Sequence, residues 1–471
     1  MKRHSMDQTS ATSAGPWRTF GLTGIAVFLV SLDATIGFAA FPALRDSFPA
    51  ASAAYISWVL NAYTIVYAAL LVPAGRLADL LGRKRLFLAG VSLFTAASAL
   101  CGLAPNVETL IGFRILQAVG AALLTPTSLA LILQAFPVHK RAIAVSLWGA
   151  LGALAAALGP SAGAAIIEAA DWRWAFYVNV PFGVYAAVRA ARLLAESSNP
   201  EQGAALDVPG VLLVIASVSL VTLGIVQSDA WGWASAATAW TVGGGIALAL
   251  AFVRWAWKRP GAAIDLSLFR DTTYRFANLG TLTFSIAFTA MFLSYFVFLR
   301  GVWHYSLSLA GLAITPGPLM VIPVAVVCGR LAGRVGHRPF LVLGGLLYAA
   351  AGAWLYFRIG AEPQFLAVWL PGLLIGGAGV GMVLPSLAGA AVAKLPAARF
   401  GIGSAVNMAV RQLGATLGVA FAVSLLASAP GVAGFHHINL LLIAGGLATA
   451  LLSLPVATAP ARAVAATPTT A

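Results

Sequence analysis

Asp33 is the carboxylate in this chain that is best placed to do chemistry, because it lies well inside an apolar segment long enough to cross a bilayer. An ionised, unpaired carboxylate in a membrane interior costs several kcal/mol. Desolvation favours the neutral form of such a group, so Asp33 can bind a proton and release it when its surroundings change. The alternative is a structural acceptor that caps a break in the same helix near Pro42. We predict a role in proton or substrate binding.

Arg114 and Gln117 form a second candidate group. Arg114 lies within the apolar segment 108–131, and a lone arginine in a membrane needs a partner or water. Either Asp33 or Glu108 can be that partner, and the sequence does not choose between them. Gln117 follows three residues later and shares a helix face with Arg114. That face either lines a cavity for substrate or packs against a neighbouring helix.

Two further groups are candidates for the wall of a substrate cavity. Asn407 and Arg411 lie close together in segment 402–427, where they either contact a polar or anionic substrate or pair across an interface. Phe292 belongs to a stripe of aromatic residues spaced by three and four along segment 276–299. Such a stripe either lines a hydrophobic pocket or forms a lipid-facing or packing face.

The elements that carry these residues are transmembrane helices. The chain is 60% hydrophobic and 9% charged, whereas a soluble domain carries roughly 25% charged residues. Only helices satisfy their own backbone in lipid, and the short alternating segments of a membrane barrel are absent. We read fourteen apolar runs in the sequence, at about 17–39, 55–74, 86–103, 108–131, 142–166, 174–194, 208–227, 237–257, 276–299, 309–330, 340–358, 365–388, 402–427 and 438–455.

The basic residues are distributed unevenly over the connecting segments. Lysine and arginine gather in alternate connections, including 75–85, 254–275 and 329–338. The other connections hold only Arg45, Arg173, Arg300 and Arg358. This asymmetry is the positive-inside rule, and it predicts that both termini are cytoplasmic. It also explains the net charge of +14 without nucleic acid as a partner.

One basic loop occurs twice. The segment Gly75–Lys84 returns at 329–338, with Gly333 where the first copy has Asp79. A duplicated loop between membrane helices is typical of transporters built from two related halves. The copies lie eight predicted helices apart rather than six, which predicts an inserted helix pair between the halves. The predicted regions are a disordered tail (1–16), a six-helix half (17–194), a linker with the inserted pair (195–257), a second six-helix half (258–455) and a second disordered tail (456–471).

Several motifs together resemble the fourteen-helix drug–proton antiporters of the major facilitator superfamily along nearly the whole chain. They are the signature loop Gly75–Arg85, the first-helix motif Leu32–Ile36, the fourth-helix motif Arg114–Gly120, the fifth-helix motif Gly159–Gly163, the segment Asp171–Pro181 and the motif Arg411–Gly414. The chain departs from the family pattern at Phe38, where asparagine is usual, and at Ala118, Ala155 and Ala164, where glycine is usual.

The resemblance implies an all-α membrane fold with two six-helix halves and gives roles to particular residues. It implies that Arg114 takes part in proton coupling with Asp33. It implies a cytoplasmic latch made of Gly75, Asp79, Gly82, Arg83 and Lys84, although the same residues also suit a plain basic turn. It further implies an export-associated helix kink at Gly159, Pro160 and Gly163. By themselves these residues predict a missing backbone donor and close helix contact.

The predicted function is proton-coupled export by alternating access. The sequence has no phosphate-binding loop for ATP and no metal-binding set, so no cofactor and no metal are expected, and no catalytic constellation suggests an enzyme. We predict a monomeric antiporter in a bacterial inner membrane that exchanges protons for lipophilic drugs or toxic compounds and thereby gives antibiotic resistance. The alternative is an exporter of a specific metabolite or natural product. An uptake symporter or a channel is less favoured.

Overall fold

The computed structural model describes residues 15–198, 207–257, 259, 262, 264–395 and 399–457, and the regular elements of this part of the chain are helices. The first bundle consists of α1 (Pro16–Ser47), α2 (Ala53–Ile56), α3 (Trp58–Leu81), α4 (Arg83–Leu103), α5 (Val107–Ala135), α6 (Val138–Ala169), α7 (Trp174–Tyr177) and α8 (Asn179–Leu193). An intervening group consists of α9 (Val208–Val226), α10 (Ser228–Trp231) and α11 (Ala236–Trp257). The second bundle consists of η2 (Leu266–Arg270), α12 (Thr272–Gly301), α13 (Leu307–Ile314), α14 (Pro316–Val335), α15 (Arg338–Arg358), η3 (Phe365–Trp369), α16 (Leu370–Val392), α17 (Phe400–Ser428) and α18 (Val432–Leu452).

Nearly all predicted spans return as membrane-length helices. In the described part of the chain, 13 helices are long and apolar enough to cross a membrane. The remaining predicted span, 174–194, is divided between α7 and α8, and its last turns carry Arg189 and Arg192. The interruption is Val178 alone, whose backbone angles are helical, and it leaves α8 with 15 residues. The fold class expected from the sequence, an all-α polytopic membrane protein, is confirmed.

Local sequence signals set where several helices begin and end. The side chains of Asn106, Asp207 and Asp271 accept hydrogen bonds from backbone N–H groups in the first turns of α5, α9 and α12. The two copies of the basic loop end α3 at Gly82 and α14 at Gly336, with φ of 108° and 79°. Only glycine adopts such backbone angles readily, which explains why both copies keep it.

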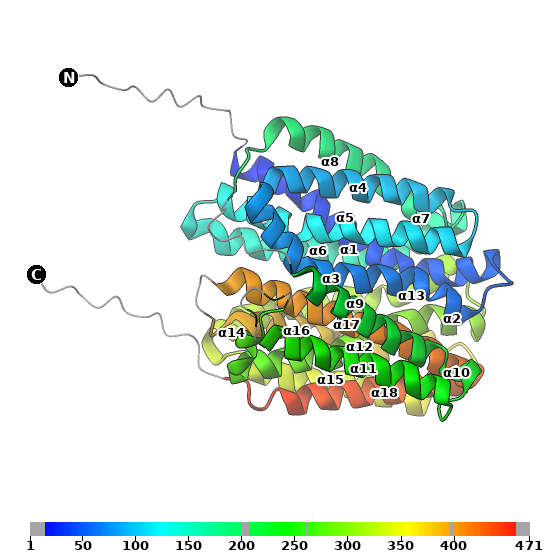
Figure 1. Cartoon of the computed structure of the whole chain (residues 1–471). Coiled ribbons are helices and arrows are strands. Elements are labelled where there is room, and N and C mark those ends of the chain that lie inside the picture. Colours follow the sequence, from blue (N-terminus) through cyan, green and yellow to red (C-terminus); the bar gives the residue numbers. More distant parts are fainter. Residues whose placement is uncertain are drawn as a thin grey trace, which may run out of the picture.

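The helices pack as two bundles, and Figure 1 shows the blue-to-cyan bundle above the yellow-to-red one. The helix pairs with the most contacts between the bundles are α3 with α17, α6 with α13 and α1 with α12. In the green intervening group, α9 packs against α3 and α17, whereas α11 packs mainly on α9. Trp240 on α11 is 80% exposed, as expected for a side chain that faces lipid.

Most of the two predicted tails lies outside the described residues. At the edges of these tails, Pro16 is already the first residue of α1, and Val456 is buried. The backbone N–H of Ala457 donates to the hydroxyl of Thr273 at the start of α12, which ties the end of the described chain to the second bundle.

Candidate functional site

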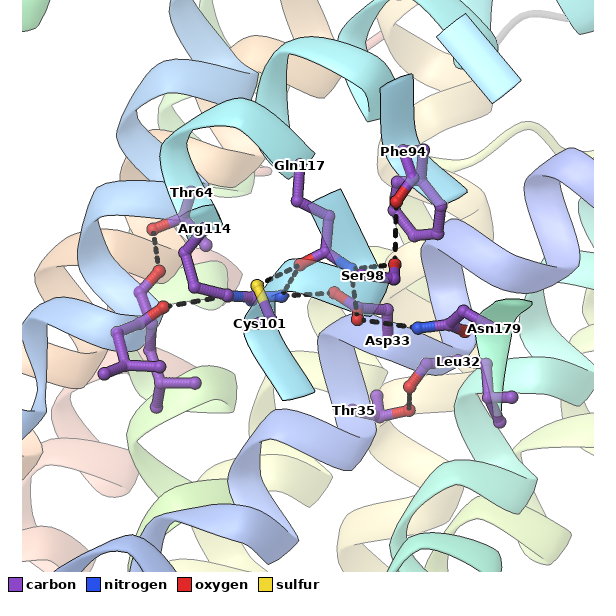
Figure 2. A network of polar contacts seen from close by, with 12 residues as sticks. Leu32, Asp33, Thr35, Thr64, Phe94, Ser98, Cys101, Arg114, Gln117 and Asn179 are labelled. Carbon is purple, nitrogen blue, oxygen red and sulfur yellow. Dashed lines mark hydrogen bonds and ion pairs between the residues drawn. The ribbon is translucent and has the colours of Figure 1, made fainter. Parts of the chain in front are cut away.

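Asp33 lies in the interior of the first bundle and is the centre of a polar network (Figure 2). Its side chain is 2% exposed. One carboxylate oxygen accepts a hydrogen bond from Arg114 Nη1 at 2.6 Å. The other accepts from Gln117 Nε2 at 2.8 Å and from Asn179 Nδ2 at 3.1 Å. Three donors from two other helices therefore surround one carboxylate, so this buried polar group has the partners that a membrane interior demands.

Arg114 is held on several sides at once. Its Nε donates to the backbone oxygen of Val59 at 3.0 Å, and its Nη1 donates to Gln117 Oε1 at 2.6 Å. Its guanidinium carbon lies 4.1 Å from the centre of the Tyr63 ring, within the range of a cation–π contact. The sequence left Asp33 and Glu108 as possible partners of Arg114, and in the structure the partner is Asp33. Glu108 instead accepts a hydrogen bond from the Tyr55 hydroxyl.

Gln117 belongs to this network. It is fully buried, and its Nε2 also donates to the Ser98 hydroxyl at 2.8 Å. The Ser98 hydroxyl in turn donates to the backbone oxygen of Phe94. The shared helix face predicted for Arg114 and Gln117 is confirmed by their direct hydrogen bond. The side chain of Gln117 fixes the orientation of both charged groups.

The network contains residues to which sequence reasoning gave no role. Asn179 comes from the start of α8 and reaches Asp33 across the bundle (Figure 2). It stands inside the motif Asp171–Pro181, which was the one sequence signal for it. Tyr63, Ser98 and the carbonyl of Val59 carry no comparable signal, because each is an ordinary residue of an apolar helix.

The buried pair joins three helices through one arginine. Removing one charge from a buried ion pair leaves the other uncompensated, which costs about 3–5 kcal/mol. Arg114 lies on α5 and bonds to Asp33 on α1 and to the backbone of Val59 on α3, so the packing of these helices depends on the pair.

The glycines of the fifth-helix motif pack directly against the helix that carries Asp33. A Cβ atom placed on Gly159 would overlap the hydroxyl of Thr35, and one on Gly163 would lie 3.0 Å from Ile36. Both partners lie on α1, just beyond Asp33. Pro160 lies inside α6 and removes one backbone donor there. The predicted close helix contact is therefore present between α6 and α1.

We expect replacement of Gly159 by alanine to destabilise the protein. The new methyl group has no room beside Thr35, and overpacking of this kind typically costs about 1–3 kcal/mol. Thermal unfolding of the purified protein measures the effect. Gly149 on the same helix has open space around it, so Gly149→Ala is the matched control and should unfold near the wild-type temperature. Equal melting of the two variants would contradict the close contact.

The predicted cavity residues of the second half do not form one cluster. Asn407 is buried, and its Nδ2 donates to Asn278 and to Thr281 on α12, both at 3.0 Å. Arg411 is exposed on α17, and its charge acts on Tyr67 of α3 across the bundle interface. Phe292 is 5% exposed, and its ring centre lies 6.0 Å from that of Phe38 on α1. Phe292 therefore packs between the bundles, and a role in substrate binding stays a prediction.

The predicted latch residues lie where α3 meets α4. Arg83 donates to Asp79 at 2.9 Å, as expected from their spacing of four residues. The backbone N–H groups of Lys84 and Arg85 donate to the carboxylate of Glu196, which follows α8. Gly75 packs near Pro126 of α5, with an ordinary contact distance of 3.6 Å for an added Cβ. The bonded partners of Asp79, Arg83 and Lys84 thus lie in the first bundle or directly after it.

Comparison with known proteins assigns the family. The family model of the Major Facilitator Superfamily matches residues 23–419. The chain belongs to the Major Facilitator Superfamily. The structure is similar to that of the nucleoside transporter NupG, with a TM-score of 0.64 over 93% of this chain and 99% of NupG. The sequence identity is only 9%, so this likeness concerns the fold alone.

Relatives within the superfamily are named as transporters and exporters. The chain is 36% identical over 410 residues to the multidrug resistance protein Stp of Mycobacterium tuberculosis, covering 86% of this chain and 75% of Stp. It is 34% identical over 426 residues to a probable actinorhodin transporter of Streptomyces coelicolor, covering 87% of this chain and 73% of that protein. It is 29% identical over 419 residues to the tetracenomycin C resistance and export protein of Streptomyces glaucescens, covering 88% and 77%. The resemblance to the drug-exporter branch is confirmed, and the protein is a multi-pass membrane protein.

Proposed function

We propose that the protein is a proton-coupled exporter of lipophilic compounds across the bacterial cytoplasmic membrane. The observation that carries the proposal is the buried pair of Asp33 and Arg114. A titratable carboxylate and a permanent cation, enclosed within one bundle of a superfamily transporter, provide a site at which a proton can be exchanged for a change in helix packing. Each charge that crosses a membrane potential of 100 mV supplies about 2.3 kcal/mol.

The substrate class is proposed from the relatives and from the chemistry of the interface. Relatives are named for multidrug resistance and for export of actinorhodin and tetracenomycin C. In this chain, Phe38 and Phe292 bring two aromatic rings together between the bundles, and Arg411 is exposed on α17. These groups suit a largely apolar, planar compound with one polar edge. Asn407 and Gln117 are proposed to support this region by holding neighbouring helices rather than by touching the substrate.

A second candidate is the export of one specific natural product. It is favoured by the two Streptomyces relatives, each named for a single compound. The two candidates differ in breadth and not in mechanism. In either case we propose a monomer with both termini in the cytoplasm, because basic residues concentrate in the connections on that side.

The test is efflux from bacteria that lack their own drug pumps. Cells expressing the chain would be loaded with ethidium, a lipophilic fluorescent cation, and in parallel with a neutral anthracycline-like dye and an anionic polyaromatic dye. We expect at least one dye to leave faster than from vector cells, and a protonophore to abolish the difference. Efflux that survives the protonophore would contradict proton coupling. Expression in the membrane without efflux of any of these dyes would contradict broad drug export and favour the single-product candidate.

The latch is proposed to stabilise one end state of the transport cycle. Asp79 and Arg83 have side-chain exposures of 26% and 22%, so their pair contributes at most about 0.5 kcal/mol to stability. We expect Asp79→Asn to leave thermal unfolding almost unchanged and to lower the transport rate severalfold. Glu362→Gln, at an exposed carboxylate between α15 and η3, is the matched control and should change neither property. If Asp79→Asn transports at the wild-type rate, the loop is only a basic turn.

A further inference from the structure

The two bundles meet at their outer ends through a contact that crosses from α6 to α13. The α13 helix begins after Ser306, whose hydroxyl accepts a hydrogen bond from the backbone N–H of Leu309. The backbone N–H of Ser308, which also lies in the first turn of α13, donates to the carboxylate of Glu168. Glu168 is the second-to-last residue of α6. A side chain of the first bundle thus caps a helix of the second bundle.

The contact between Glu168 and the start of α13 is expected to be stronger than an ordinary surface hydrogen bond. The first N–H groups of a helix have no partners within the helix, and the helix dipole places partial positive charge there. A carboxylate satisfies the donor and the dipole together, and such charge-assisted bonds are stronger than neutral ones. Because α13 and α6 belong to different bundles, this bond exists only while the bundles are close at the outer end.

An ion pair reinforces the same end of the interface. Arg300, in the last turn of α12, lies 3.3 Å from Asp46 in the last turn of α1. The charge of Arg300 also acts on Glu168. One cation of the second bundle therefore faces two carboxylates of the first. These contacts share a feature: each donor comes from the second bundle and each acceptor from the first.

Beneath these polar contacts, the helices touch too closely to slide past one another. A Cβ atom placed on Gly311 of α13 would lie 2.9 Å from the carbonyl oxygen of Pro160 and 2.7 Å from the Cβ atom of Ala164. The aromatic contact of Phe38 with Phe292 closes the neighbouring α1–α12 crossing. At this end, apolar contacts close the space between the bundles, and the charged groups described above connect the bundles at the surface.

We propose that Glu168, aided by Asp46 and Arg300, is the outer-gate clasp that holds this transporter closed to the exterior. Glu168 positions α13 and touches neither substrate nor the proton site. The inference rests on the proposed function in one respect, because alternating access requires the outer end to open. It goes beyond that function by assigning the closing force to a carboxylate that caps a helix of the other bundle.

Pulsed electron–electron double resonance, which measures the distance between two spin labels, tests the clasp without any substrate. The labels would be placed at Ala50, between α1 and α2, and at Ala361, between α15 and η3, both exposed. Cys101 and Cys328, both buried, would first be replaced by serine to give a clean background. In lipid nanodiscs, the labels should show a shorter distance when the outer end is closed and a longer one when it is open. We expect Glu168→Ala to raise the ratio of the longer-distance population to the shorter-distance population about three- to tenfold, as expected for loss of one hydrogen bond.

The conservative and control variants separate a clasp from a general structural role. Glu168→Gln keeps an acceptor oxygen but loses the charge, so its ratio should lie between those of the wild type and Glu168→Ala. Asp46→Asn should shift the ratio in the same direction, whereas Glu362→Ala should leave it unchanged. A wild-type distance distribution in Glu168→Ala overturns the clasp even if the protein exports dyes. A shifted distribution in a protein that shows no proton-driven efflux upholds the clasp and contradicts the proposed function instead.

Discussion

Replacement of Asp33 by asparagine is expected to abolish proton-driven efflux while the protein still reaches the membrane. The asparagine side chain has nearly the same shape but cannot exchange a proton. The proposed exchange of protons for substrate therefore loses its proton-binding site. The new amide oxygen can still accept from Arg114, which also keeps its bonds to Val59 and Gln117, so the variant keeps its fold although loss of the buried charge lowers its thermal stability. We expect dye efflux at the level of vector cells, a loss of at least about tenfold for removal of an essential proton-transfer group.

The controls for this prediction separate loss of the proton site from loss of the protein. Membrane levels of the Asp33→Asn variant would be measured by immunoblot beside those of Glu362→Gln, which changes an exposed carboxylate between α15 and η3. Glu362→Gln should pump like the wild type. If Asp33→Asn pumps dye at the wild-type rate and remains sensitive to the protonophore, another group carries the proton.

The second large effect is expected from Arg114→Gln, which leaves a charged Asp33 buried without its cation. Breaking a buried pair by removing one partner costs about 3–5 kcal/mol, so the variant should lose much of its thermal stability. Replacing both partners with neutral groups leaves no uncompensated charge. The double variant Asp33→Asn, Arg114→Gln should therefore recover most of the stability lost by Arg114→Gln while remaining inactive.

The double-mutant comparison distinguishes coupled charges from independent packing. Unfolding temperatures of the wild type, both single variants and the double variant would be measured in the same detergent. If the losses of the two single variants simply add in the double variant, Asp33 and Arg114 do not act as a pair. Recovery of stability together with recovery of efflux would show that the pair is structural and that transport does not depend on it.

The sequence predicted much of the fold because membrane helices are encoded locally. A run of about 20 apolar residues is enough to place a span. The orientation that the basic residues predict stays a prediction. The duplicated loop at Gly75–Lys84 and 329–338 also follows from the sequence, and both copies end their helices at a glycine with positive φ. The division of span 174–194 was missed, although Pro181 signals it: Val178 keeps helical backbone angles, but Pro181 lacks the N–H that would bond to the carbonyl of Tyr177 at the end of α7.

The sequence identified the charged residues of the candidate site but not all of their contacts. A charged side chain in an apolar run stands out by itself, which is why Asp33 and Arg114 were found. Choosing between Asp33 and Glu108 as the partner of Arg114 requires the relative rotation and depth of α1 and α5, which no local pattern encodes. Asn179 reaches Asp33 from a helix 146 positions later. Gln117 shares the buried network with Arg114, and a role in substrate binding stays a prediction.

Infrared difference spectroscopy of the carboxyl C=O stretch, recorded during a pH titration in lipid, reports whether Asp33 takes up a proton. It needs no substrate, and it detects a buried carboxyl group that becomes protonated. If Asp33 carries the proton, a band appears in the wild type and in Glu362→Gln and is missing in Asp33→Asn. An unchanged difference spectrum in Asp33→Asn would show that Asp33 does not exchange a proton and that the proposed coupling site is wrong.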